Sequence, residues 1–488
     1  MRHRSNFNQK LAIICVLGLF VFVIVVGCSP KSNQLSTQDQ TKTPDVVDAT
    51  RTPTPGSADA EGISATQTQI AIDSSQAINI APADLSGISI RFAHPFGGKS
   101  TNLLIEIARE FSLTNPWGIW VDVEDYGSET AMVSALQIDF ENGNLPELFA
   151  IHPYELAILG DDFGTIDLMP YFQDSQWGFP DEAQEDFYPV FLEQFSVDEQ
   201  LIALPFAPQA VVNFYNRSWA NELGFSEVPQ DEIEFREQSE KATRANLADL
   251  LEDNDGTGGW IINNDPRVLA SWFHAFGGDL VINATPNFDN EAGQEAFNYL
   301  KSVYDEGYFW ISRQPDPYEY FANRYVLTYA GTLDQIPTQE GWMSSRNNQD
   351  AWTVFGFPGP DGVSMFVDGL GLMVREGTPE EQLAAWLFVK HLSEPAIQAK
   401  WVQQMFTLPV RESTMDVLVD FGNQHPQWLD AVNMIDRADP FPISEGWGIA
   451  QWVLQDAAYR IFPGEISSIE GILETLDATV KELEAMTP

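Results

Sequence analysis

Few residues in this chain have the spacing of a catalytic or metal-binding site. No two histidines lie three or four positions apart, and neither a His-Glu-x-x-His nor a Gly-x-Ser-x-Gly motif is present. The six histidines are His3, His94, His152, His274, His391 and His425. A carboxylate pair for glycoside hydrolysis needs a spatial separation that positions along the chain do not give. These residues therefore give no positive evidence for an enzyme, and we expect no catalytic activity, no metal and no cofactor.

Gly98-Lys99-Ser100 has the ending of a phosphate-binding loop. Such a loop needs another glycine five residues before Gly98, so that backbone amides can wrap the phosphates, and that position is Ala93. We therefore expect a tight turn between a strand and a helix, whose amides can hold a ligand hydroxyl.

The segment Glu252–Gly259 is dense in carboxylates and glycine. A calcium loop of the EF-hand type needs Asp at its first position and Gly at its sixth. With Gly256 as the sixth residue the first is Leu251, which has no side-chain oxygen. The segment therefore predicts a turn between a helix and a strand, and calcium binding near Asp253–Asp255 is the minor alternative.

Several aromatic residues fall in or near predicted turns. They are Phe96, Tyr154, Phe206, Trp272 and Trp447. Flat rings beside a few polar groups suit a pocket for an uncharged, hydroxyl-rich ligand, because a sugar has C–H faces and hydroxyl edges. For any single ring, ordinary core packing is an equally good interpretation.

The start of the chain has the order of an export signal. A basic head precedes an apolar run from Leu11 to Gly27, and Cys28 follows. Val25-Val26-Gly27-Cys28 resembles the bacterial lipobox, in which the cysteine becomes the acylated N-terminus. We therefore expect a lipoprotein signal peptide at 1–27 and a membrane-anchored protein facing the extracellular or periplasmic side. An uncleaved transmembrane anchor is the alternative, since the run is at the short end of what spans a bilayer.

The composition excludes one class of partner. The chain has 25 Lys and Arg against 71 Asp and Glu, a formal charge of −46. So acidic a surface repels phosphate backbones, which excludes nucleic acid. Cys15 would be removed with the signal, so Cys28 is the one cysteine of the mature chain and no disulfide is expected. The stability must then come from a large hydrophobic core.

Residues 28–84 are rich in Ser, Thr, Gln and Pro and predict a flexible tether behind the acylated cysteine. The folded part begins near Leu85 and is about 400 residues long, which is too long for one simple core and suggests two lobes.

Strand and helix patterns alternate at the start of the folded part. Strands are predicted near 88–92, 119–123 and 148–151, with helices near 103–111 and 132–140 between them. This order predicts a parallel sheet with helices on its faces. A ligand crevice is then expected beyond the carboxyl ends of the strands, near Phe96, Gly127 and His152.

Alternating elements continue to the end of the chain. Further strands are predicted at 201–205, 210–215, 325–330, 352–357 and 370–374, and further helices at 268–276, 291–306, 383–388, 448–461 and 467–484.

A series of short motifs runs along the folded part. They are Ile88–Gly98, Phe140–Glu147, Leu204–Phe206, Asn213–Arg217, Leu223–Phe225, Trp272–Asp279, Ala384–Lys390 and Ala399–Arg411. In their order and spacing, these motifs together resemble the extracellular solute-binding proteins (family 1) of ABC importers, over nearly the whole chain from about Gly87.

The resemblance implies an α/β fold of the periplasmic-binding-protein type (type II). Each of its two lobes is a sheet flanked by helices, and a hinge between the lobes lets them close on a ligand. Chain crossings are expected near Pro205–Gln209, Thr353–Phe357 and Phe406–Pro409. The first lobe would then comprise 85–208 plus 353–407, and the second 209–352 plus 408–488.

The resemblance also implies a set of ligand-binding positions. They are Phe96, Gly98, His152, Tyr154, Phe206, Gln209, Asp265, Arg267, Trp272, Thr332, Gly369 and Trp447. Asp265 and Gln209 would bind hydroxyls, and Trp272 and Trp447 would stack on sugar faces.

Three of these positions have other implied features. Backbone amides near Gly98 and Gly369 would add donors. Thr332 falls near a strand-end aromatic of the maltose-binding proteins, so that stacking ring is missing here.

The implied function is a monomeric receptor that binds a sugar or oligosaccharide and delivers it to the permease subunits of an ABC importer. The nearest alternative is a binder of a phosphorylated polyol such as glycerol phosphate, for which Arg267, Arg411 and Lys99 are the candidate cations. An exported hydrolase and an adhesion lipoprotein without a solute are more distant alternatives.

Overall fold

The computed structural model describes residues 78–155, 163–262, 265–282, 285–312, 316–462 and 468–485. Cys28, the predicted signal peptide and most of the predicted tether lie outside the described residues. The last part of that tether is described, and it is already part of the fold: Ile78 and Ile80 pack against the core, and the Ile78 N–H donates to Asp174 Oδ2 at 3.0 Å. Among the described helices, none has both the length and the apolar character needed to cross a membrane.

The strands belong to one large mixed sheet and two small ribbons. They are β1 Ser89–His94, β2 Trp120–Asp125, β3 Leu148–Ile151, β4 Ser196–Val197, β5 Gln200–Leu201, β6 Leu204–Asn216, β7 Gly258–Ile262, β8 Val281–Ile282, β9 Thr285–Pro286, β10 Phe309–Ile311, β11 Val326–Thr332, β12 Trp352–Phe355, β13 Phe357–Gly359, β14 Gly362–Val374 and β15 Ala438–Pro440.

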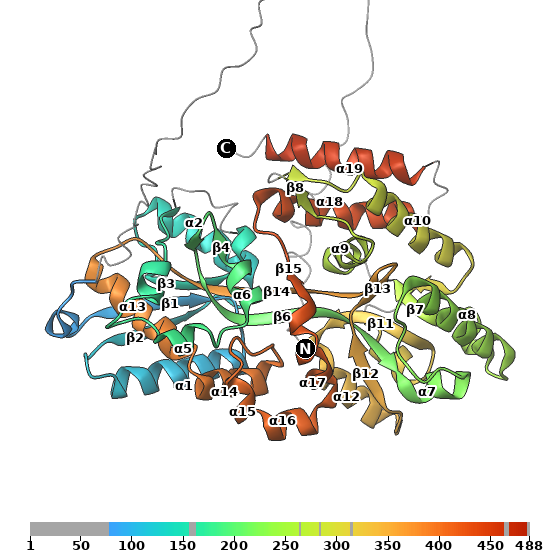
Figure 1. Cartoon of the computed structure of the whole chain (residues 1–488), viewed down its shortest axis with the longest axis horizontal. Helices are drawn as coiled ribbons and strands as arrows, with labels where there is room; N and C mark the ends of the chain where they lie inside the picture. The colour runs from blue at the N-terminus through green and yellow to red at the C-terminus, as the bar shows by residue number, and fades with distance from the viewer. Residues whose placement is uncertain are drawn as a thin grey trace, which may run out of the picture. The chain divides into compact units, whose positions relative to one another are not determined.

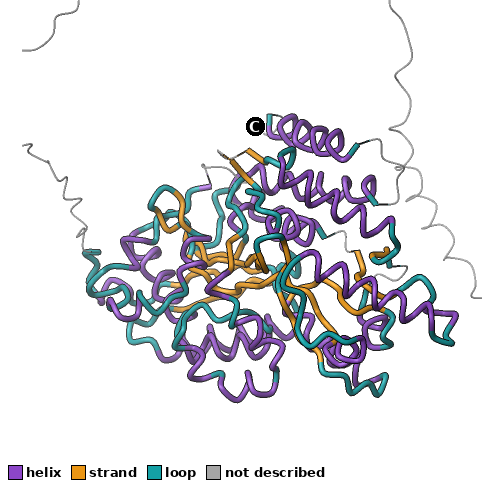
Figure 2. The backbone as a smooth tube through the Cα atoms, turned by 45° about the vertical axis from the view of Figure 1, so that its right-hand side comes forward, coloured by secondary structure: helices purple, strands orange, loops and turns teal. Residues whose placement is uncertain are grey.

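Helices flank the sheet on both sides (Figure 2). They are α1 Lys99–Thr114, α2 Glu129–Glu141, α4 Met169–Phe172, α5 Asp181–Gln184, α6 Pro189–Gln194, α7 Arg217–Leu223, α8 Glu232–Ala248, α9 Pro266–Ala275, α10 Glu291–Asp305, α11 Tyr318–Ala322, α12 Ile336–Ser345, α13 Pro379–Leu392, α14 Pro395–Met405, α15 Thr414–Val417, α16 Val419–Gln424, α17 Pro426–Val432, α18 Glu445–Ile461 and α19 Ile469–Glu484.

The large sheet has the order β10-β7-β11-β6-β14-β3-β1-β2. Its two long central strands, β6 and β14, are antiparallel and run between the two halves of the sheet (Figure 1). We call the β1–β2–β3 half, with the helices packed on it, the first lobe, and the β7–β10–β11 half the second lobe. The predicted two-lobed α/β fold is confirmed.

The first lobe is built as its alternating pattern predicts. β1 pairs in parallel with β2 on one side and with β3 on the other. The apolar faces of α1 and α13 cover the sheet, and Leu104, Phe111 and Phe388 are buried in one core with the strands. Parallel strands joined by helices must bury both faces, which explains why every residue of β3 is buried.

The second lobe has a core on each face of its sheet. One core gathers the buried faces of α9, α10, α18 and α19, and the other gathers those of α11, α12 and α17. Trp272 on α9 and Trp447 on α18 lie in the first of these cores.

β6 replaces two predicted strands, 201–205 and 210–215. It continues through Pro205 and Pro208, which lie opposite Gly371 and Gly369 of β14, and a register shift falls between Leu370 and Gly371. Proline removes one ladder donor, and a bulge is a place where a sheet tolerates that loss. The prolines therefore mark the crossing without ending the strand.

Three chain passages between the lobes meet at Pro208. β6 leads from the first lobe to the second, β14 leads back, and the segment after α14 crosses again. Gly369 lies opposite Pro208 in the ladder, and the Leu408 N–H donates to the Pro208 carbonyl at 2.8 Å. Pro208 and Leu408 fall within the segments 205–209 and 406–409, where crossings were expected.

The resemblance placed the middle crossing near 353–357, but these residues pair and pack with strands of the second lobe. β12 pairs with β6, and Val354 and Phe355 pack in the cores of the second lobe. A β13–β14 hairpin then turns the chain back within that lobe. The passage to the first lobe follows only near Asp368–Leu370, where β14 leaves its contacts with β15 and begins to pair with β3.

Candidate functional site

A cavity of about 640 Å³ lies between elements of the two lobes. The first lobe contributes the start of α2 and the residues just after β3, and the second lobe contributes the start of α9 and one face of α18. This volume is within the range of small-molecule sites. The carboxyl end of β3 is also where the open-sheet rule predicts a ligand crevice.

On the first-lobe side, His152 and Glu129 form an ion pair. Glu129 is the first residue of α2, and both of its carboxylate oxygens lie 2.7 Å from His152 Nδ1. Glu129 also accepts the backbone N–H of His152 at 2.9 Å. The ring of Tyr154 stacks on His152 with centroids 5.1 Å apart. The helix start thus fixes the orientation of the imidazole.

In this pair, each charged group stabilises the charged form of the other. Burial opposes the imidazolium form, but Glu129 and Asp368 outweigh burial and raise the pKa of His152 to about 9. Burial likewise opposes the Glu129 carboxylate, and His152 outweighs it and holds the pKa of Glu129 below its ordinary value. At neutral pH both groups are therefore charged.

On the second-lobe side, Asp265 and Arg267 form a second ion pair. Asp265 is the N-cap of α9, where its Oδ1 accepts the Arg267 backbone N–H at 2.9 Å. The Arg267 guanidinium donates to Asp265 through Nη2 at 2.8 Å and through Nε at 3.2 Å. Burial disfavours the charged guanidinium, but Asp265 and then Asp368 outweigh it and raise the pKa of Arg267.

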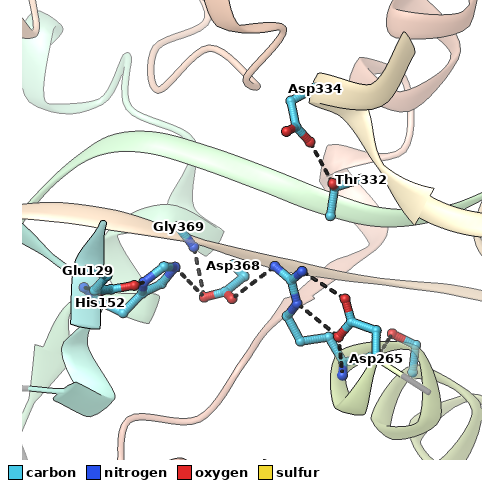
Figure 3. A network of polar contacts seen from close by, with 9 residues as sticks. Glu129, His152, Asp265, Thr332, Asp334, Asp368 and Gly369 are labelled. Atoms are coloured by element: carbon cyan, nitrogen blue, oxygen red, sulfur yellow. Dashed lines mark hydrogen bonds and ion pairs between the residues drawn. The ribbon is translucent and has the colours of Figure 1, made fainter. Parts of the chain in front are cut away.

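Asp368, on β14, stands between the two pairs (Figure 3). Its Oδ1 accepts the Gly369 N–H at 2.8 Å and lies 3.6 Å from His152 Nε2. Its Oδ2 lies 4.0 Å from Arg267 Nη1. The sequence reasoning missed this residue, because an aspartate within a long strand has no pattern that distinguishes it.

The aromatic residue that faces the cavity from α18 is Trp452, not Trp447. Trp452 is 76% exposed and lines the cavity together with Gln451 and Gln455. Trp447 is 1% exposed and stacks on Phe441, with centroids 5.3 Å apart. The helical period of the sequence could have distinguished the two rings. Trp447 lies on the same helix face as the buried Ala450, Leu454 and Ala458, whereas Trp452 lies off that face.

The structure corrects the predicted role of Trp272 in the same way. Its side chain is fully buried among Phe235, Trp260 and Phe357. Trp272 lies on the apolar face of α9, which packs into the core of the second lobe, so its ring points away from the cavity.

The predicted ligand-binding positions divide into two groups. His152, Tyr154, Asp265 and Arg267 line the cavity together. The others lie outside its lining. Two of them, Trp272 and Trp447, are buried in the core of the second lobe. For the remaining six, contact with a ligand stays a prediction, and they are Phe96, Gly98, Phe206, Gln209, Thr332 and Gly369.

Those outer positions have structural roles of their own. Phe96 and Phe206 each lie 4.8 Å from the ring of Trp401. Gly98 is the N-cap of α1, with a φ of 65°, and Gln209 lies opposite Asp368 in the β6–β14 ladder. Thr332 ends β11 and donates to Asp334.

Of the candidate cations for an anionic ligand, Arg267 alone lines this cavity. Lys99 is exposed at the start of α1. Arg411 is paired with Asp186 at 2.6 Å and lies over the rings of Phe179 and Phe187.

The acidic segment before β7 forms the predicted turn. A short 3-10 helix, Glu252–Asn254, leads into β7, and Asn254 Nδ2 donates to Asp249 Oδ2 at 2.8 Å. Within the described ranges, no group of three or more His, Cys, Asp or Glu side chains is placed to hold a metal ion.

Comparisons with known structures identify similar folds. The sugar-binding protein MalE from Xanthomonas citri aligns with a TM-score of 0.70 at 20% identity, covering 82% of this chain and 98% of its own. The cyclic alpha-maltosyl-1,6-maltose binding protein from Arthrobacter globiformis gives 0.67 at 16%, covering 81% and 98%. UgpB from Mycobacterium tuberculosis, in complex with glycerophosphocholine, gives 0.67 at 17%, covering 82% and 99%. No curated protein sequence matches this chain.

The family is shown by a sequence match of its own. Residues 106–428, more than half of the chain, match the family described as bacterial extracellular solute-binding protein. The match agrees with the family expected from the order of motifs. This chain is therefore a member of the bacterial extracellular solute-binding proteins.

Proposed function

We propose that this protein is the receptor of an ABC importer, which captures a sugar or oligosaccharide between its lobes and delivers it to a membrane permease. The lobes would close about the crossings that meet at Pro208, because only the closed form contacts a ligand from both sides. The lobe boundaries that we propose from the core packing are near Pro208, Asp368 and Leu408.

The chemistry of the cavity lining carries this proposal. Trp452 offers an exposed ring, and Tyr154 a second ring with a hydroxyl. Gln451, Gln455 and Ser134 add amide and hydroxyl groups around them. Rings for C–H faces, with polar groups for hydroxyl edges, are what a carbohydrate ligand requires.

The similar structures support the same ligand class. They include a maltotriose-binding protein from Thermus thermophilus bound with maltotriose, besides the Xanthomonas and Arthrobacter proteins. All three are proteins that bind a solute, which agrees with a receptor that performs no catalysis.

A binder of a phosphorylated polyol is the second candidate, because Arg267 lines the cavity and the Mycobacterium protein was solved with glycerophosphocholine. The charges favour the neutral sugar. Arg267 already forms ion pairs with Asp265 and Asp368, and His152 is paired with Glu129. Glu155 adds another carboxylate to the lining, so an anionic group would meet a net negative site.

Calorimetric titration of the whole protein distinguishes these candidates. We expect a neutral oligosaccharide such as maltotriose or a cyclic maltosyl-maltose to bind, and glycerol phosphate and glycerophosphocholine to give no heat of binding. Arg267→Ala should keep measurable sugar binding, with Arg236→Ala, whose partner Glu306 lies on the surface of the second lobe, as the control. Binding of the phosphorylated ligands alone, abolished by Arg267→Ala, would contradict the sugar assignment.

We also propose that Cys28 is acylated and that the segment after it tethers the receptor to the outer face of the membrane. The support is the sequence order of basic head, apolar run and cysteine, together with membership in an extracellular family. A flexible tether of about 50 residues has a root-mean-square reach of roughly 40 Å from its anchor, which keeps a receptor close enough to find a permease.

A further inference from the structure

Asp368 is a buried carboxylate at the crossing of the two lobes. Its side chain is 4% exposed, and it lies on β14 next to Gly369, where the chain passes from the second lobe to the first. One hydrogen bond, from the Gly369 N–H, is not enough to offset the desolvation of a charge, so the carboxylate depends on nearby cations.

The two cations near Asp368 come from different lobes. His152 follows β3 in the first lobe, and Arg267 starts α9 in the second. Each has a nearer partner in its own lobe: His152 lies 2.7 Å from Glu129, and Arg267 lies 2.8 Å from Asp265. Each pair joins residues of one lobe, so a rotation of the lobes leaves both pairs intact.

The contacts of Asp368 are longer, at 3.6 Å to His152 and 4.0 Å to Arg267. These two contacts join Asp368 to residues of different lobes, so their lengths depend on the angle between the lobes. A buried carboxylate attracts both cations strongly because little water screens it. Rotation of one lobe away from the other must weaken at least one attraction.

Resting on the proposed receptor function, the geometry points to Asp368 as the positioning residue that couples lobe closure to the binding cavity. Its carboxylate draws His152 of the first lobe and Arg267 of the second toward the crossing, and so favours the arrangement in which both line one cavity. Asp368 acts through these two residues and is not itself part of the lining.

The test is Asp368→Asn, which removes the charge and keeps the shape and the acceptor for the Gly369 N–H. We expect the Kd for a bound oligosaccharide to rise about tenfold, within the usual range for coupled sites. In small-angle scattering the ligand-dependent decrease in radius of gyration should become smaller. Asp368→Glu keeps the charge and should stay within about threefold of the wild-type Kd.

Asp477→Asn is the matched control. Asp477 is also a buried carboxylate, and it accepts the N–H groups of Phe288 and Asp289 within the second lobe. Its replacement should lower the melting temperature without changing the Kd or the scattering.

The proposal is overturned if Asp368→Asn keeps the wild-type Kd and scattering change, or if Asp477→Asn weakens binding as much. A tenfold rise of the Kd in Asp368→Glu also overturns it, because the shape of the side chain and not its charge would then matter. This variant is informative even if Asp368→Asn does not fold. A wild-type protein that binds no oligosaccharide at all contradicts the proposed function instead. Wild-type binding that Asp368→Asn leaves unchanged contradicts the coupling alone.

Discussion

At the scale of single residues, the cavity is defined by two ion pairs and one exposed ring. Glu129–His152 and Asp265–Arg267 hold their polar atoms in fixed positions at two helix starts. Groups fixed in this way can bind ligand hydroxyls without losing much side-chain freedom, which is the main cost of binding with flexible residues.

The His152 pair makes stability depend on pH. The folded-state pKa of about 9 lies above the ordinary 6.5, so the contribution of His152 is fully present below about pH 6.5 and is lost as the pH rises through 9. The groups that face the imidazole are Glu129, Asp368, Arg267 and Tyr154. The contribution is on the order of 3 kcal/mol for a shift of this size.

We therefore expect His152→Gln to lower the free energy of unfolding most below about pH 6.5. Denaturant unfolding of both proteins at a series of pH values measures the difference in unfolding free energy between them. This difference should narrow as the pH rises from about 6.5 through 9, because the wild-type protein then loses the same interaction. A difference that stays constant would show that His152 is not charged in the folded protein.

Trp452 should matter for binding and little for folding. Its ring is 76% exposed, so Trp452→Ala removes cavity surface and leaves the core intact. We expect the Kd for an oligosaccharide to rise about tenfold, or about 1.4 kcal/mol, in calorimetry, with an unchanged melting temperature. Tyr459→Ala, an exposed ring elsewhere on α18, is the control. If the two replacements changed the Kd equally, Trp452 would not be part of the binding site.

At the scale of elements, β14 is the strand that joins the lobes and positions Asp368. It pairs with β15 before the crossing and with β3 after it, and with β6 throughout. At Gly369 the neighbouring strand approaches so closely that a Cβ would lie 2.6 Å from Pro208 Cα and 2.7 Å from the Ala207 carbonyl oxygen. Only glycine fits this position without a shift of the backbone.

Gly369→Ala should therefore distort the crossing. We expect a loss of about 1–3 kcal/mol in the free energy of unfolding, as for an overpacked core, and a weaker ligand-dependent closure in scattering. Gly341→Ala on α12 is the matched control, because no atom lies within 4 Å of its Cβ position and alanine favours helix by up to about 1 kcal/mol. A stable, normally closing Gly369→Ala protein would show that the crossing tolerates a wider strand separation.

At the scale of the whole molecule, a protein of charge −46 is repelled by anionic headgroups, so the proposed attachment to a membrane requires an anchor. We expect Cys28→Ala to release the receptor into the medium or to leave an unprocessed precursor, as fractionation and mass spectrometry of the N-terminus would show. Cys15→Ala should keep the wild-type distribution. If the wild-type protein keeps residues 1–27 and Cys28→Ala stays membrane-bound in the same uncleaved form, 11–27 is a transmembrane anchor and the lipobox interpretation is wrong.

The sequence by itself determined the family, the fold class and most elements of this protein. Periodicity predicted β1 to β3, α1 and α2 because parallel strands and their covering helices carry local patterns of burial. The residue types of the segment Glu252–Gly259 predicted the turn before β7. The family resemblance placed His152, Tyr154, Asp265 and Arg267 among the twelve ligand-binding positions, and these four line the cavity.

Only the tertiary structure decided which polar groups meet and which rings are free. Trp272 and Trp447 are buried and Trp452 is exposed because helix packing selects the face that is covered. The middle passage between the lobes lies at Asp368 and not near 353–357, because the β13–β14 hairpin keeps the preceding strands in the second lobe. Asp368 has no local signal, since its partners, His152 and Arg267, are separated from it by 216 and 101 positions and are brought near it by the fold alone.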